Sequence, residues 1–296
     1  AEEVSPLMTE YEMYVSLNDK LFERVKSVYA GKDSLGLEPD QRRLLENTYR
    51  SFARNGANLS EEDKAVYSKY VEELSLLSLQ FGKNVLASTN AYKLHLTDSS
   101  DLAGLPDYVR ELGAMTAGEM GLEGWVFTLD YPSYLPFMQN SERPDLRREM
   151  FLAYNSKALG GENDNTETVR KIADLRIKIA NILGYETWAD YVLEENMATV
   201  VKFLDDLMTP SLPYARKDVE AVFDYAKANG FAEMARAAGM DPDQFMPWDF
   251  SYWSEKYKQA EYALSDEQLK PYFRLEDCID AVFSLAGRLY GISFEE

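Results

Sequence analysis

The sequence predicts an all-α protein with a small two-stranded β insertion. Apolar residues recur at helical spacing along most of the 296 residues, and only two short stretches alternate apolar and polar residues as a strand does. No internal repeat and no low-complexity linker interrupts the pattern. We therefore expect residues 1–296 to form one continuous helical assembly, with the β insertion near 92–130.

The first third of the chain predicts three helices. We expect them at 17–28, at 39–52 and from 61 onward, with start signals at Ser16, Pro39 and Ser60 and a C-terminal stop at Asn55–Gly56. The expected inward faces are Leu17, Leu21, Val25 and Val28 in the first helix, Leu44, Leu45, Thr48 and Phe52 in the second, and Val66, Tyr70, Leu74, Leu77, Phe81 and Val85 in the third.

The middle of the chain changes period. Segments 92–97 and 125–130 alternate as strands do, and a short helix is expected at 106–117 between them. The proline-rich segment 131–138 is expected to connect this part to further helices. These helices are expected at 166–183, near 200–229, near 249–263 and near 275–290, and the first should bury Val169, Ile172, Leu175, Ile179 and Ile182.

The charge balance excludes some partners. The chain has 31 basic and 51 acidic residues, a formal charge of −20, which disfavours nucleic acid and anionic membrane surfaces. No run approaches the ~20 apolar residues of a membrane-spanning helix. These observations leave the compartment open, and our working expectation is the cytoplasm, with the periplasm as the alternative.

The single histidine and single cysteine limit the possible chemistry. His95 lies on the polar side of the first expected strand without a visible catalytic partner, so we interpret it as an ordinary strand residue. A zinc hydrolase needs more histidine ligands than this chain contains. Cys278 is expected to be a buried structural thiol.

Several other motifs have structural interpretations. The acidic pairs Glu61–Glu62, Glu194–Glu195, Asp205–Asp206 and Glu295–Glu296 fit solvated helix faces, since adjacent helical residues do not face each other. Segment 162–167 lacks the glycine and terminal glutamate of a calcium loop and is expected to cap a helix. The glycines at 118, 121 and 124 precede a strand, so they favour a turn over a dinucleotide site.

Aromatic residues are dense at Trp248–Trp253 and occur again at Tyr131 and Tyr134. Core packing is the simpler interpretation. The alternative is the wall of a groove that holds a peptide.

Many segments together resemble the thimet oligopeptidase and neurolysin family of zinc metallopeptidases, and within it the bacterial peptidyl-dipeptidase branch. The similarity runs in order over nearly the whole chain. The segments include Leu44–Phe52, Gly56–Ser60, Gln80–Leu86, Tyr131–Met138, Ala153–Lys157, Ala180–Tyr185, Trp188–Tyr191, Asn196–Ala198, Pro247–Asp249 and Leu269–Phe273.

The resemblance implies a neurolysin-like helical channel wall in a protein that cleaves short peptides. It also implies zinc in the complete protein, bound by two histidines and a glutamate, with the HExxH glutamate as general base. This sequence contains no HExxH motif, so no catalytic or metal residue can be carried over and none is expected to bind zinc here. Tyr131 and Tyr134 are our candidates for substrate-channel contacts.

Two interpretations of function therefore stay open. In the first, the chain is the central piece of an oligopeptidase, is inactive alone, and pairs with the remainder of its own chain. Such a piece should expose apolar surface and self-associate. In the second, it is a stand-alone helical module that binds a peptide or a partner without catalysis.

Overall fold

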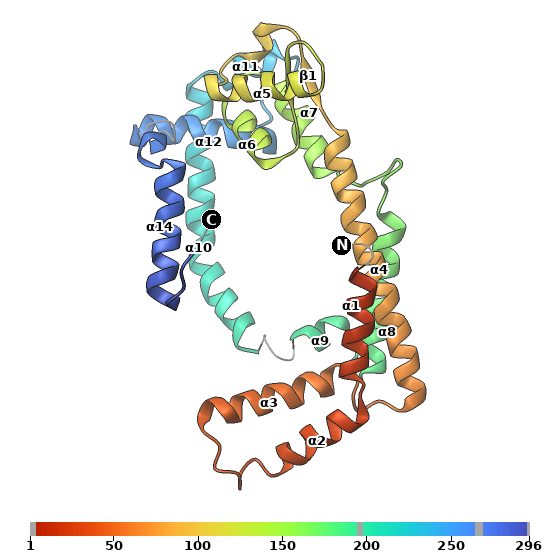
Figure 1. Cartoon of the computed structure of the whole chain (residues 1–296). Coiled ribbons are helices and arrows are strands. Elements are labelled where there is room, and N and C mark those ends of the chain that lie inside the picture. The colour runs from red at the N-terminus through yellow and green to blue at the C-terminus, as the bar shows by residue number, and fades with distance from the viewer. Residues whose placement is uncertain (1–3, 194–197, 264–268, 295–296) are drawn as a thin grey trace. The chain divides into compact units, whose positions relative to one another are not determined.

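The computed structural model describes residues 4–193, 198–263 and 269–294, and most of them lie in helices, as predicted (Figure 1). The chain divides into two compact units. Unit 1 contains residues 1–93 and 153–213, and unit 2 contains residues 94–152 and 214–296. No helix in the described ranges is long and apolar enough to cross a membrane.

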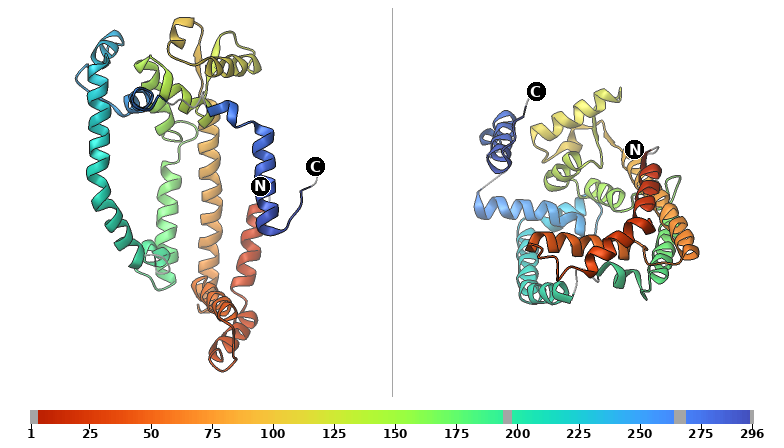
Figure 2. Two further views of the ribbon diagram at one scale, coloured as in Figure 1. Left: turned by 90° about the vertical axis from the view of Figure 1, so that its left-hand side faces the viewer. Right: turned by 60° about the horizontal axis from the view of Figure 1, so that its bottom comes forward.

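Unit 1 is built on two long helices that run side by side, α4 (Glu61–Ala91) and α8 (Thr166–Ile182) (Figures 1 and 2). Helix α1 packs on α4, and α2 packs on α3. The other helices of this unit are α1 (Val4–Ser16), α2 (Asp19–Ala30), α3 (Pro39–Arg54), α9 (Trp188–Leu193) and the first part of α10 (Ala198–Ala228).

The α2–α3 pair buries a different face from the one the sequence predicts. The buried residue of α2 is Phe22, which stacks on Tyr49 and Phe52 at centroid distances of 5.8 and 5.7 Å. Leu21 and Val28 are exposed instead. The expectation was wrong because it followed aliphatic spacing, whereas stacking between aromatic rings decides how these helices meet.

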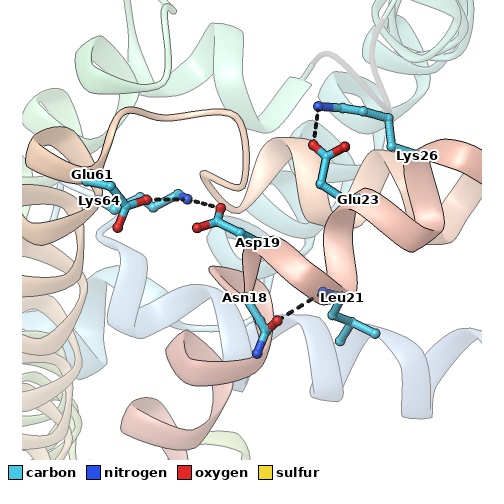
Figure 3. A network of polar contacts seen from close by, with 7 residues as sticks. All are labelled: Asn18, Asp19, Leu21, Glu23, Lys26, Glu61 and Lys64. Carbon is cyan, nitrogen blue, oxygen red and sulfur yellow. Dashed lines mark hydrogen bonds and ion pairs between the residues drawn. The ribbon is translucent and has the colours of Figure 1, made fainter.

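A polar network joins the starts of α2 and α4 (Figure 3). Lys64 is buried and donates to Asp19 and, at 2.9 Å, to Glu61. The hydrogen bond to Asp19 raises the pKa of Lys64, because it favours the charged ammonium. The N-cap of α2 is Asn18, whose side chain accepts from the Leu21 amide, and not Ser16 as the sequence suggested.

Segment 162–167 caps α8 and anchors it to α4, as the sequence predicts. Asp164 accepts from the backbone amides of Gly160 and Thr166. Asn165 is buried, donates to the Phe81 carbonyl and accepts from Asn84. The loop therefore has a structural explanation that needs no calcium.

The inward face of α8 is narrower than expected. Leu175 and Ile179 are buried, while Val169 is exposed. Val169 lines an open surface pocket together with Ser78 and Phe81 of α4.

Unit 2 contains the β insertion and the remaining helices. Its elements are β1 (Leu94–Leu96), η1 (Ser99–Leu102), α5 (Asp107–Glu119), β2 (Trp125–Phe127), α6 (Tyr131–Asn140), most of α7 (Pro144–Asn155), the end of α10, α11 (Phe231–Ala237), α12 (Pro247–Tyr262), η2 (Lys270–Tyr272) and α14 (Leu275–Tyr290). Strands β1 and β2 are antiparallel, with Leu94 opposite Phe127 and Leu96 opposite Trp125, which confirms the predicted two-stranded insertion.

The glycine run before β2 forms a turn, as predicted, and one member is needed for close approach. Gly124 has φ +89°, and a Cβ there would lie 2.3 Å from the Leu96 carbonyl oxygen. Gly121 also has a positive φ, +68°, but a Cβ there would meet nothing within 4 Å. Only Gly124 therefore lets the two strands approach.

The prediction for segment 131–138 was wrong, because it is helical and forms most of α6. Pro132 lies in the first turn, where the missing N–H has no intrahelical acceptor in any case. Pro136 is inside the helix, and its own carbonyl accepts from the Asn140 side chain. Pro136 removes one backbone N–H donor from the helix.

One hydrophobic core cluster of unit 2 joins three helices. It is formed by Val222 and Ala226 of α10, Phe231 of α11, and Tyr252 and Trp253 of α12. The aromatic segment at 248–253 thus contributes to the core, which is the simpler of the two interpretations. Cys278 on α14 is half-buried, not buried as expected, because α14 buries none of its residues.

We predict that Gly124→Ala destabilises unit 2 much more than Gly121→Ala does. Both alanines carry the strain of a positive φ, about 1 kcal/mol. Only Gly124→Ala adds a clash with backbone, for about 3 kcal/mol in total. Urea unfolding followed by tryptophan fluorescence measures both, and equal losses would contradict the assigned role of Gly124.

Candidate functional site

The predicted channel residues Tyr131 and Tyr134 lie on α6. Tyr131 is 67% exposed, and Tyr134 is half-buried. Their role in a channel stays a prediction.

His95 has the structural role that its position in the strand predicted. Its ring is exposed, and Nε2 lies 2.7 Å from the Glu123 carbonyl oxygen. Within the described ranges no three His, Cys, Asp or Glu side chains lie close enough to hold a metal ion. Whether the chain takes part in a zinc site stays a prediction. The acid pairs at 194–195 and 295–296 lie outside the described residues.

Unit 2 contains a pocket of 330 Å³ between α7, α11, the loop that precedes α12, and the start of α12. Its deep side is formed by buried residues and its rim by exposed ones. The buried lining residues are Pro144, Arg147, Phe231, Ala235 and Asp249, the half-buried ones are Met234, Met240, Met246 and Trp248, and the exposed ones are Arg148, Gly239, Asp241 and Gln244.

A fully buried ion pair forms the base of this pocket. Arg147 has no exposed surface, and its guanidinium donates to Asp249 at 2.7 Å and to the Ser141 carbonyl at 2.7 Å. Its Nε also donates to the Trp248 carbonyl at 3.2 Å. The guanidinium lies 4.6 Å from the centre of the Tyr252 ring. Arg147 therefore fixes α7 against α12 and against the turn before α7.

The electrostatics of this pair follow from its burial. Burial raises the pKa of Asp249, and the charge of Arg147 opposes the shift. Asp249 also accepts from the Met246 amide at 3.2 Å, which caps the first turn of α12. Burial likewise raises the pKa of Tyr252 to about 12, so this phenol stays neutral. The only formal charges at the base belong to the pair and cancel, which suits this site to packing and binding.

Trp248 is the side chain that joins this base to the rim. Its ring meets Phe151 edge-on at 5.9 Å, and the Arg148 guanidinium lies 5.8 Å from its centre. Its indole Nε1 is buried and has no hydrogen-bond partner among the residues that the structure describes. Tyr252 and Trp253 are core residues, which confirms the simpler interpretation for them, whereas Trp248 lines a pocket. That an aromatic groove holds a peptide stays a prediction.

Unit 1 has a larger cavity of 660 Å³ between α3 and the end of α8. Its lining is aromatic and basic: Tyr29, Glu46, Tyr49, Arg50, Ala53, Arg54, Leu183 and Tyr185. Arg54 donates to the Tyr191 carbonyl, and its guanidinium lies 4.5 Å from the centre of the Tyr191 ring. This arginine therefore connects α3 to α9.

Neither pocket was predicted from the sequence. The pocket in unit 2 combines residues around 144–148 with residues around 231–249, which no local pattern connects. One signal in the sequence pointed to part of the pocket: a proline that can begin a helix, Pro247, directly precedes the dense aromatic segment that starts at Trp248. It did not indicate that α7 and α11 form the other walls.

Comparison with known sequences identifies the family of the chain. Residues 137–296 match the sequence model of Peptidase family M3, which is more than half of the chain. The chain therefore belongs to this family, which confirms the resemblance seen in the sequence.

Three characterised relatives show the breadth of the similarity. The chain is 33% identical to oligopeptidase A of Escherichia coli (strain K12), 28% identical to the dipeptidyl carboxypeptidase of the same organism, and 26% identical to saccharolysin of Saccharomyces cerevisiae. The alignments cover 100%, 100% and 98% of this chain but only 43%, 43% and 40% of the relatives. The chain thus spans less than half the length of each relative.

We predict that Arg147→Met destabilises unit 2 by about 3–5 kcal/mol, because the Asp249 carboxylate would stay buried without its partner. Arg148→Met is the matched control, since this neighbour is exposed and its contact with the Trp248 ring is worth at most about 1 kcal/mol. Denaturant unfolding in a Trp188→Phe background makes the remaining three tryptophans report on unit 2. Equal effects of the two substitutions would contradict the role of the pair.

Proposed function

We propose that this chain is part of a zinc-dependent oligopeptidase or peptidyl-dipeptidase that hydrolyses short peptides, and that it forms part of the wall of the substrate channel. The observation that carries the proposal is the similarity to peptidases of both kinds along essentially the whole chain. A cytoplasmic location is part of the same proposal.

The chemistry of the chain supports a binding role and not a complete active site. Its one histidine lies within hydrogen-bond distance of a backbone carbonyl, and the buried charges of Arg147 and Asp249 cancel as a pair. Neither group is placed to activate water for attack on a peptide bond, which needs a general base within hydrogen-bond reach of that water. The zinc ligands would thus have to come from a part of the protein that this sequence does not include.

The surface of α14 supports a partner for this chain. Leu275, Ile279, Val282, Ala286 and Leu289 recur at spacings of 4, 3, 4 and 3, which places them on one face of the helix. Val282 and Leu289 are 63% and 65% exposed. A continuous apolar helix face exposed to water marks an interaction surface. We propose that the remainder of a longer chain covers it, and that self-association replaces this contact when the chain is alone.

A second function is favoured by the pocket in unit 2. A formed pocket of 330 Å³ could bind part of a peptide without any catalysis. A stand-alone peptide-binding module is therefore the alternative.

The proposal predicts that this chain alone hydrolyses no short peptide in the presence of zinc. A protein that extends this sequence to the length of the relatives and includes an HExxH motif should hydrolyse the same peptide, and a chelator should abolish that activity. Mass spectrometry of an unlabelled octapeptide gives the readout. Chelator-sensitive hydrolysis by this chain would refute the proposal, and an open reading frame that ends at Glu296 would favour the binding module.

For the channel residues, we predict that Tyr131→Ala with Tyr134→Ala raises KM at least threefold in the complete enzyme and changes kcat less. This split is expected when a substitution removes binding that substrate and transition state share. Tyr262→Ala is the matched control, because Tyr262 is also exposed, at 72%, on another helix. Unchanged KM in the double variant would remove both tyrosines from the channel.

A further inference from the structure

We propose that Asn229, at the junction of α10 and α11, is a site of spontaneous deamidation, and that the isoaspartate it yields loosens α11 from the core cluster of unit 2. Asparagine is one of the thermolabile residues of proteins. The modification needs no enzyme, and it does not depend on the proposed function.

The reaction joins the side chain of Asn229 to the backbone of Gly230. The Gly230 nitrogen loses its proton and attacks the side-chain carbonyl carbon of Asn229, a C–N bond forms, and the side-chain nitrogen takes up a proton and leaves as ammonia. Water then opens the cyclic imide. Cleavage at the side-chain carbonyl gives aspartate, and cleavage at the backbone carbonyl gives isoaspartate. Glycine hinders the attack least of all residues, because it has no Cβ.

The sequence contains two Asn–Gly dipeptides, and each follows the last turn of a helix. They are Asn55–Gly56 after α3 and Asn229–Gly230 after α10. Both asparagine side chains donate to the carbonyl four residues earlier, that of Ser51 at 2.8 Å and that of Tyr225 at 2.7 Å. Because the dipeptide and its capping hydrogen bond are the same at both places, the surroundings decide which asparagine reacts.

The surroundings of Gly56 hold its backbone in place. Gly56 is buried, and its amide donates to the Ala53 carbonyl at 3.4 Å. A Cβ on Gly56 would lie 3.0 Å from the Leu59 side chain and 3.3 Å from the ring of Tyr67, which is itself buried. The Gly56 nitrogen therefore reaches the Asn55 side chain only after a local opening of this contact.

The surroundings of Gly230 are open. Asn229 is exposed, and the Gly230 amide donates no hydrogen bond within the described part of the chain. A Cβ on Gly230 would have one neighbour within 4 Å, the Glu233 carboxylate at 3.9 Å. The attack requires the Asn229 side chain to leave the Tyr225 carbonyl, but it breaks no hydrogen bond of the Gly230 amide. We therefore expect Asn229 to react faster than Asn55.

The products affect the core because Phe231 follows this dipeptide directly. Phe231 is 4% exposed and packs in the core cluster with residues of α10 and α12. Isoaspartate adds one carbon to the main chain between α10 and α11, which moves Phe231 relative to α10. Both products also replace the amide by a carboxylate, which cannot donate to the Tyr225 carbonyl and lies at the negative end of the α10 dipole.

The first experiment compares the two dipeptides within one protein. The chain is incubated in mildly alkaline buffer and digested with pepsin in acid, where deamidation is slow. Mass spectrometry then gives the converted fraction of each asparagine over time. We expect Asn229 to convert at least about tenfold faster than Asn55, because Asn55 reacts only after a local opening.

The same incubation in urea is the control, since unfolding removes the difference in surroundings and the two rates should become similar. Equal rates in the folded chain, or faster conversion of Asn55, would overturn the proposal. A difference that persists unchanged in urea would also overturn it, because the local sequence would then explain the difference.

The second experiment measures the effect on α11. Methylation by a protein L-isoaspartate methyltransferase identifies the isoaspartate, and hydrogen exchange of the α11 amides is compared between fresh and incubated chain. We expect exchange at least about tenfold faster in the converted molecules. Asn229→Gln is the matched control, because glutamine keeps the amide donor and forms its larger cyclic imide much more slowly.

Two outcomes would contradict the loosening of α11. One is unchanged exchange in chain whose Asn229 has become isoaspartate. The other is exchange in incubated Asn229→Gln that is as fast as in the incubated unsubstituted chain. The conversion rates are measured on the unsubstituted chain, so that part of the test does not depend on how the variant folds.

Discussion

The buried pair of Arg147 and Asp249 is the constraint on which unit 2 depends. A guanidinium with no exposed surface has to be satisfied by the protein, and here a carboxylate and the carbonyls of Ser141 and Trp248 satisfy it. These partners lie before α7 and at the start of α12, about a hundred residues apart in sequence. The same contacts place Trp248 beside the pocket and bring α12 into the core with Phe231. The hydrogen bonds that bury the Arg147 guanidinium therefore also position the residues at the base of the pocket.

The sequence predicted the helices well where apolar spacing and caps agree. Segments 39–52 and 166–183, and the β pair around 94 and 125, form as expected. Prediction from the sequence failed where a contact with another element decides which face of a helix is buried. The buried face of α2 follows the rings of α3 and not its own aliphatic spacing. Segment 131–138 was expected to connect the β insertion to further helices, yet it forms most of a helix whose first turn accepts a proline.

The candidate site was only partly predictable for the same reason. The aromatic density at 248–253 was visible, but its division into core residues and a pocket residue depends on α7 and α11, which lie far away in sequence. Family membership was visible because many short segments agree in order along the chain. What the chain does in a longer protein rests on that similarity, together with the apolar face of α14.

That face gives the most direct test of the central claim, that this chain is one part of a larger peptidase. Hydrogen exchange of the α14 amides can be measured in this chain alone and in a protein extended to the length of its relatives. The account predicts fast exchange in the chain alone, because α14 buries none of its residues, and at least tenfold slower exchange in the longer protein. Equal exchange rates in the two proteins would contradict it.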